Sequence, residues 1–226
     1  MLNNLYEKET TDLSNKIIRA GMIVIDIGAH VGYFTRVFSK LVGPAGIVYA
    51  FEPDLSNFKL LQANTRRFKN IKLSPAAVSD KNSAIDFYHS NDKAGCHSTI
   101  PATYRQEQIK VSSISLDCWA EDNNIPKIDL VKIDIEGGEI YALRGMKRII
   151  ETNPKIVLFI EYCPENIKLA GFTNDDFLRE LNSLGLKIFA INQNGPNEIK
   201  NIPQLGNFMG DRGFLNLYCS KNDKPN

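Results

Sequence analysis

The sequence is poor in the residues that build metal centres and disulfide frameworks. Its four cysteines form no C-x-x-C pair, and its three histidines form no H-x-x-x-H pair. A zinc site made of cysteine and histidine is therefore not expected, and no resident metal ion is predicted. Isolated cysteines of this kind are typical of reduced, buried or half-buried positions; here they are Cys96, Cys118, Cys163 and Cys219.

An excess of one charge and long apolar runs are also lacking. The 27 lysines and arginines nearly balance the 26 aspartates and glutamates, so bulk electrostatics gives no reason to expect a nucleic-acid partner. No stretch approaches the roughly 18 consecutive apolar residues of a membrane span. Residues 1–12 are polar and mixed in charge, unlike a signal or transit peptide. We therefore expect a cytoplasmic protein.

The chain alternates between short apolar runs and segments with helical spacing. Its 226 residues, 43% of them hydrophobic, suit one globular domain over 1–226. Strands are predicted at 22–27, 47–51, 72–73, 76–78, 129–133, 156–160, 186–191 and 214–219, and helices at 33–41, 55–68, 139–150 and 174–184. This alternation predicts an α/β fold, with a mostly parallel sheet and helices on both faces.

Three segments fall outside the alternation. Residues 1–20 form a helical or irregular lead-in, and residues 221–226 a tail. Between β segments at 84–88 and 111–115, residues 89–108 are rich in small and polar side chains. A loop of that length in a compact domain is typically functional, so we predict a lid there. With residues 193–211, it is expected to build the acceptor pocket.

The loop after the first strand, Asp26 to Thr35, is the most informative segment. It has an acidic residue at the strand end and glycines at 28 and 32. Glycine lets the backbone turn sharply and approach a ligand closely. A dinucleotide-binding G-x-G-x-x-G motif is excluded, because His30 and Tyr33 occupy the other two glycine positions. The carboxylate would repel a phosphate and suits an amine or hydroxyl, which indicates a ligand with a nucleoside and an amino-acid part.

The next strands end in further acidic residues. Glu52 lies 20 residues after Gly32, where a carboxylate can accept hydrogen bonds from both ribose hydroxyls. For Asp54 we favour a helix N-cap. Asp80 follows a small apolar strand that leaves room for a flat base; it either accepts from an exocyclic amine or forms an Asx turn.

A buried strand at 129–133 delivers three carboxylates, those of Asp134, Glu136 and Glu139. Carboxylates packed together raise one another's pKa, which costs free energy unless a ligand, a metal or a proton offsets it. The helix dipole favours Glu139 in a first helical turn. Asp134 and Glu136 have no such explanation and are candidates for the chemistry.

These segments together resemble the FkbM family of S-adenosylmethionine-dependent methyltransferases. The resemblance runs from about residue 21 to 161, with a weaker match at 213–219. It rests on the motifs DIGAHVGYF (26–34), FEPD (51–54), AVSD (77–80), SLD (115–117) and DLVKIDIEGGE (129–139). It implies a Rossmann-like class I methyltransferase fold, with seven strands of which the last is antiparallel.

The resemblance also implies the cofactor, S-adenosyl-L-methionine, and its site. The methionine part is expected over the glycine loop, the ribose on Glu52 and the adenine near Val78 and Asp80. His30 stands where the family commonly has asparagine, and both side chains can donate a hydrogen bond. The residues predicted to bind the cofactor are Asp26, Gly28, Ala29, His30, Gly32, Tyr33, Glu52, Pro53, Val78, Asp80 and Asp134.

The reaction implied is O-methylation of a hydroxyl on a sugar or another small metabolite. An alcohol must lose its proton during the transfer, so a base within hydrogen-bond reach helps. Asp134 is the first candidate to contact the acceptor or the cofactor amine, followed by Glu136 and then by His97. In one alternative, Asp134, Glu136 and Glu161 hold a divalent cation that assists the transfer. In another, the chain is a regulatory protein that only binds the cofactor.

Overall fold

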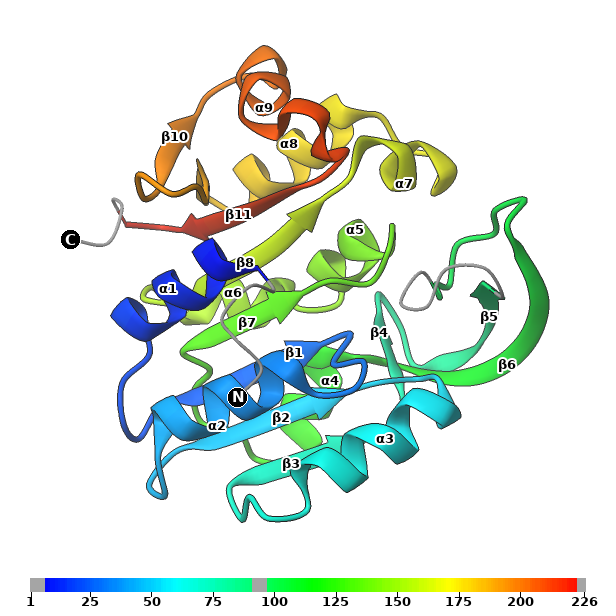
Figure 1. Cartoon of the computed structure of the whole chain (residues 1–226), viewed down its shortest axis with the longest axis vertical. Helices are drawn as coiled ribbons and strands as arrows, with labels where there is room; N and C mark the ends of the chain where they lie inside the picture. Colours follow the sequence, from blue (N-terminus) through cyan, green and yellow to red (C-terminus); the bar gives the residue numbers. More distant parts are fainter. Residues whose placement is uncertain (1–6, 91–96, 223–226) are drawn as a thin grey trace.

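The computed structural model describes residues 7–90 and 97–222. Its main element is an eight-stranded sheet with the order β10-β9-β11-β8-β7-β1-β2-β3 (Figure 1). The strands are β1 (Ile23–Ile27), β2 (Ile47–Phe51), β3 (Ile71–Ser74), β7 (Leu130–Ile133), β8 (Val157–Tyr162), β9 (Lys187–Ala190), β10 (Asn197–Ile199) and β11 (Leu215–Ser220).

The predicted α/β class is confirmed, whereas the predicted strand number is too low by one. Strands β3, β2, β1, β7 and β8 pair in parallel, and β11 runs antiparallel to both β8 and β9. The additional strand is the short β10, which pairs antiparallel with β9 at the edge of the sheet. Three residues carry too little alternation to be recognised as a strand in the sequence.

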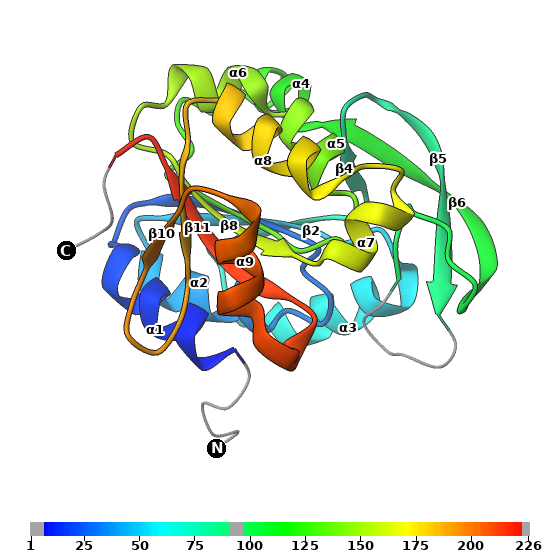
Figure 2. The same ribbon diagram turned by 90° about the horizontal axis from the view of Figure 1, so that it is seen from above.

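Helices cover both faces of this sheet (Figure 2). On one face lie α1 (Lys8–Ile17), α2 (Tyr33–Val42) and α3 (Leu55–Thr65), and on the other α4 (Leu116–Asp122), α5 (Glu139–Arg144), α6 (Lys147–Thr152) and α8 (Asn174–Ser183). The remaining elements are α7 (Pro164–Leu169), α9 (Ile202–Met209) and the 3-10 turn η1 (Gly210–Arg212). No helix in the described ranges is long and apolar enough to cross a membrane.

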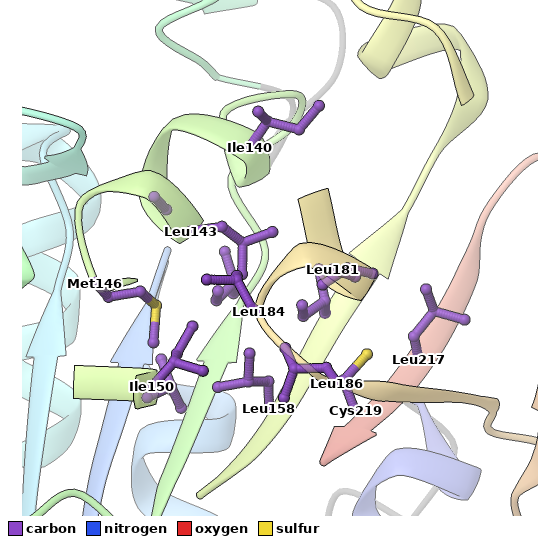
Figure 3. Close-up of a cluster of buried hydrophobic side chains, with 14 of the residues drawn as sticks. Ile140, Leu143, Met146, Ile150, Leu158, Leu181, Leu184, Leu186, Leu217 and Cys219 are labelled. Atoms are coloured by element: carbon purple, nitrogen blue, oxygen red, sulfur yellow. The ribbon is translucent and has the colours of Figure 1, made fainter. Parts of the chain in front are cut away.

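Each face of the sheet has its own hydrophobic core. On the α2 face, Phe34, Phe38 and Val42 recur every fourth residue and pack on the sheet, as the helical spacing predicts. The larger cluster, on the face covered by α5, α6 and α8, is drawn in Figure 3. Its labelled members are Ile140, Leu143, Met146, Ile150, Leu158, Leu181, Leu184, Leu186, Leu217 and Cys219. Cys219 is a packing residue, and Cys118 and Cys163 are also free thiols; Cys96 lies outside the described residues.

Three strands form a separate small sheet beside the main one, with the order β4-β6-β5. They are β4 (Ala77–Ser79), β5 (Ser83–Ser90) and β6 (Arg105–Ser115). The predicted strand at 76–78 exists as β4, but it pairs with β6 and not with the main sheet. The hairpin β5–β6 curves away from the main sheet (Figure 1).

The predicted loop at 89–108 is shorter than expected. His89 and Ser90 belong to β5 and pair with Glu107 and Arg105 of β6, and Tyr88 forms an isolated bridge to Ser98. Residues 91–96 of the predicted lid lie outside the described residues. The hairpin extends farther than its pattern indicated because a strand exposed on one face tolerates polar side chains.

Other boundaries also differ from the predictions. The expected helix at 139–150 is two helices, α5 and α6, separated near Gly145, where a Cβ would lie 1.9 Å from the carbonyl oxygen of Ser79. Helix α3 ends at Thr65 and not at residue 68, and its first residue, Leu55, is 59% exposed. In the predicted tail, the Lys221 Nζ atom donates to the carbonyl of Glu151, and residues 223–226 lie outside the described residues.

Candidate functional site

A cavity of about 430 Å³ lies at the carboxyl ends of β1, β2, β7 and β8. This is where ligands bind in open α/β sheets, and the volume lies within the range of small-molecule sites. The cavity is built by the glycine loop (26–35), the β2–α3 loop, β4, the hairpin β5–β6 and the acidic loop between β7 and α5 (134–138). The lining residues discussed below are Asp26, Gly28, Ala29, His30, Tyr33, Phe51, Glu52, Pro53, Val78, Phe87, His97, Thr99, Lys132, Asp134, Glu136 and Glu161.

The glycine loop packs directly against the end of β7. Gly28 has φ +79°, and a Cβ there would lie 1.9 Å from the carbonyl oxygen of Asp134. Gly32 has φ +90°, and its Cβ would lie 2.7 Å from Leu61 of α3. Both positions therefore need glycine for packing and for backbone conformation. Gly28 lines the cavity, whereas Gly32 does not and serves the turn into α2.

Asp26 lines this cavity and carries one buried oxygen without a partner in the described part of the chain. Its Oδ2 accepts a hydrogen bond of 2.5 Å from Thr35 Oγ1, while its buried Oδ1 has no hydrogen-bond partner among the described residues. Burial raises the pKa of Asp26, and the nearby Lys132 opposes that rise. An unpaired buried acceptor costs free energy unless a ligand donates to it.

Glu52 is held by two backbone amides at the end of β2. Its Oε2 accepts from His30 N at 2.8 Å, and its Oε1 accepts from Asp54 N at 2.9 Å. Burial raises the pKa of Glu52 to about 7, although the two amides lower it. Each oxygen has a second lone pair, so the carboxylate can still accept from ligand hydroxyls. Asp54 caps α3, as predicted, by accepting from Asn57 N.

Asp134 is paired with Lys132, a residue that the sequence analysis overlooked. Lys132 is buried in β7, opposite Asp26 of β1, and its Nζ donates to Asp134 Oδ2 at 2.7 Å. The same Nζ lies 4.8 Å from the ring centroid of Phe34. Burial opposes the positive charge, yet Asp134, Asp26 and Glu7 raise the pKa of Lys132 above its ordinary value. A buried lysine between two apolar residues of a strand is itself a signal, because such a charge requires a partner.

Two more carboxylates complete an acidic group. Oxygen atoms of Asp134, Glu136 and Glu161 all lie within 4.8 Å of one another. Glu136 Oε2 accepts from Asn166 Nδ2 at 2.8 Å. Burial, together with the charges of Asp134 and Glu136, raises the pKa of Glu161. Such a group can share a proton or hold a divalent cation through oxygen ligands.

Glu139, the other carboxylate of this segment, lies in the first turn of α5 and does not line the cavity. It accepts from the backbone nitrogens of Ile135 and Gly137, so it fixes the acidic loop. Burial raises its pKa to about 7, although these hydrogen bonds lower it.

Two predicted site residues, His97 and Asp80, have surroundings that the sequence did not indicate. His97 lines the cavity, but its Nδ1 already accepts from Ser90 N at 3.0 Å. A neutral imidazole has a single acceptor nitrogen, so this bond argues against His97 as a base. Asp80 is exposed, accepts from Ser79 Oγ at 3.2 Å and does not line the cavity.

The remaining predicted residues converge on the cavity. Ala29, His30, Tyr33, Pro53 and Val78 all line it. Besides Lys132, sequence reasoning missed Phe87 and Thr99, which come from the small sheet and the segment after residue 96. Whether these two residues line the cavity depends on how the hairpin folds back, and no local sequence pattern indicates that.

Comparison with known proteins identifies related chains. The family model described as the methyltransferase FkbM domain matches residues 26–188. The chain is similar to the 2-O-methyltransferase NoeI of Sinorhizobium fredii, with 26% identity over 160 residues, covering 64% of this chain and 65% of NoeI. It is also similar to the hexuronic acid methyltransferase AglP of Haloferax volcanii, with 25% identity over 130 residues, covering 58% of this chain and 52% of AglP.

Solved structures agree on the fold. A methyltransferase FkbM from Methylobacillus flagellatus superposes with a TM-score of 0.57 at 19% identity, covering 96% of this chain and 47% of that one. Fibrillarin from Aeropyrum pernix superposes with a TM-score of 0.53 at 13% identity, covering 92% of this chain and 74% of that one. The chain thus spans between about half and two thirds of the length of NoeI, AglP and the M. flagellatus protein.

Proposed function

Because the chain belongs to the FkbM methyltransferase family, we propose that it transfers a methyl group from S-adenosyl-L-methionine to a hydroxyl group of a small acceptor. The observation that carries the proposal is the set of acidic side chains on the cavity wall, which includes Asp26, Glu52 and Asp134. A ligand with an amine fits beside them, whereas a phosphate does not.

The described residues of the cavity suit each part of this cofactor. Asp26 accepts from the amine of the methionine part, and Glu52 accepts from the ribose hydroxyls. Phe51 and Val78 offer an apolar wall to the adenine ring. When bound, S-adenosylmethionine supplies a methyl group attached to a positively charged sulfur.

The acceptor hydroxyl is proposed to meet Asp134. One oxygen of Asp134 is held by Lys132, so the carboxylate has a fixed orientation, and its other oxygen accepts the proton that the hydroxyl loses. Glu161 keeps its own proton, because burial and the neighbouring carboxylates raise its pKa, and it can donate a hydrogen bond to the acceptor. Glu136 and Thr99 add polar groups to the same wall.

We propose a sugar as the acceptor class. NoeI is named as a 2-O-methyltransferase and AglP as a hexuronic acid methyltransferase. Several carboxylates on one wall can accept from the neighbouring hydroxyls of a sugar, whereas they repel an anionic acceptor. An uncharged sugar therefore suits this chain better than a uronic acid does.

The test is transfer of an isotopically labelled methyl group from S-adenosylmethionine to a panel of neutral and anionic sugars. We expect label in a neutral sugar with the parent protein, and at least a hundredfold slower transfer with the Asp134→Asn variant, the scale of general-base catalysis. Equal transfer by parent and variant would remove Asp134 from the chemistry. Cofactor binding without transfer to any sugar would favour the regulatory alternative.

A further inference from the structure

The hairpin β5–β6 contacts both sides of the cavity. On its cofactor side the hairpin reaches the loop between β2 and α3, and Phe87 of β5 lines the cavity. On the other side, the segment from His97 to Arg105 reaches the acidic loop after β7. The hairpin is therefore placed to connect the two loops across the site.

On the cofactor side the link is His89. Its Nε2 lies 2.8 Å from Asp54 Oδ2, at ion-pair distance but outside hydrogen-bond geometry, and its Nδ1 lies 3.5 Å from Glu107 Oε2. The side chain of His89 is 19% exposed and that of Asp54 only 4%, so water screens this contact far less than it screens a surface ion pair.

Asp54 in turn connects to the group proposed to hold the ribose. Its backbone nitrogen donates to Glu52 Oε1 at 2.9 Å, and its Oδ1 accepts from Asn57 N at 2.6 Å. A displacement of Asp54 would therefore move both a hydrogen bond of the Glu52 carboxylate and the first turn of α3. The contact of His89 with Asp54 limits such a displacement.

On the acidic side the hairpin is fixed by buried contacts. Ser98 Oγ donates to the carbonyl oxygen of Glu136 at 2.8 Å. The guanidinium of Arg105, whose side chain is fully buried, donates to the carbonyl oxygens of Ile100 at 2.7 Å and of Glu136 at 3.4 Å. This end is thus held by hydrogen bonds from two buried side chains, so loosening is expected first at the His89 end.

We propose that His89 is a positioning residue for the cofactor: by holding Asp54, it keeps the Glu52 carboxylate in place and the hairpin closed over the ribose side of the cavity. This inference rests on the proposed function, because it presumes that S-adenosylmethionine occupies the cavity. His89 does not line the cavity and is proposed to act through Asp54, although its ring also packs against Phe87 and His97.

The variant that tests the inference is His89→Ala, with Lys110→Ala as the matched control. Lys110 lies on the same hairpin and pairs with Asp86 at 2.7 Å, but both partners are more exposed, at 66% and 35%. The dissociation rate of S-adenosylhomocysteine is measured by stopped flow, and amide exchange is followed in the free proteins. We expect His89→Ala to release the ligand about three- to tenfold faster, corresponding to one partly buried polar contact, and to speed exchange at residues 52–58 and 83–90. Lys110→Ala should match the parent in both.

A double-mutant cycle with Asp54→Asn separates positioning from general stability. Asparagine is also a good N-cap, so α3 keeps its cap. In the Asp54→Asn background, His89→Ala should add no further increase in dissociation rate. The inference would be overturned if the two substitutions multiplied each other's effect on the dissociation rate. It would also be overturned if His89→Ala had the parental dissociation and exchange rates. A parent that does not bind S-adenosylhomocysteine would instead overturn the proposed function, and the exchange rates of the free proteins would still decide whether His89 holds the loop.

Discussion

Ionisation of Glu52 is expected to control the affinity for S-adenosylhomocysteine between pH 6 and 8. In the free protein burial raises the pKa of this carboxyl to about 7. The ionised fraction therefore rises from roughly one tenth at pH 6 to roughly nine tenths at pH 8. Ribose hydroxyls bind a carboxylate better than a neutral carboxyl, so binding lowers the pKa and releases a proton near pH 7.

The size of this effect follows from the hydrogen bonds involved. Those to a charged group contribute about 1.5–3 kcal/mol, and those between neutral groups about 0.5–1.5 kcal/mol. A difference of about 1–1.5 kcal/mol corresponds to an affinity roughly five- to tenfold higher at pH 8 than at pH 6. The backbone amides of His30 and Asp54 hold the carboxylate in both states, so its orientation should change little.

Isothermal titration calorimetry at pH 6, 7 and 8 measures the effect, and two buffers of different ionisation enthalpy reveal the released proton. The Glu52→Gln variant is the control, because it keeps the shape but cannot ionise; one of its amide hydrogens would also face a backbone N–H group. We expect it to bind more weakly at pH 8 and with little pH dependence. A parent whose affinity is flat from pH 6 to 8, or a variant with the parental pH slope, would refute this account of Glu52.

Three further outcomes are expected. Gly28→Ala should destabilise the fold by about 2–5 kcal/mol in urea unfolding, because its Cβ would lie 1.9 Å from the carbonyl oxygen of Asp134 and φ is +79°. Gly21→Ala is the control, since Gly21 has φ +85° but nothing within 4 Å of its Cβ, and it should cost only about 1–2 kcal/mol. Equal losses of stability would contradict the role of packing at Gly28. Because the pKa of Glu52 is raised, its contribution to stability is fully present below pH 4.5 and is lost as pH rises to about 7. The melting temperature of ligand-free Glu52→Gln, relative to that of the parent, should therefore rise from pH 4.5 to pH 7. A relative melting temperature that rises on acidification would contradict this. With Asp134 as the base, EDTA should leave methyl transfer unchanged, whereas loss of transfer that Mg²⁺ restores would support the alternative in which Asp134, Glu136 and Glu161 hold a cation.

Much of the main sheet could be predicted because its signals are local. Apolar runs that end in glycine or acidic residues mark β1, β2 and β7, and strands of this kind are buried on both faces. The residues predicted for the cofactor converge on one cavity because the carboxyl ends of neighbouring parallel strands share one edge. Asp26, Glu52 and Asp134 each follow or end such a strand.

The parts that failed depend on distant contacts. The pairing of β4 with β6 and the break at Gly145 are related, since Gly145 packs against the backbone of Ser79. The sequence carries no local sign of that contact. The hydrogen bond from Ser90 that occupies His97, and the exposure of Asp80, likewise depend on how the hairpin folds back. Lys132 is a different case, because a lysine inside an apolar strand could have been recognised as a buried charge that needs a partner.

The cavity at the ends of β1, β2 and β7 is proposed to bind S-adenosylmethionine. Calorimetric titration of the parent protein with S-adenosylhomocysteine at pH 8, with NAD as the comparison ligand, tests this proposal most directly. We expect saturable binding of one S-adenosylhomocysteine per chain, weakened by Glu52→Gln, and no binding of NAD. Absence of S-adenosylhomocysteine binding by a folded parent, or equal affinity for NAD, would contradict the proposal.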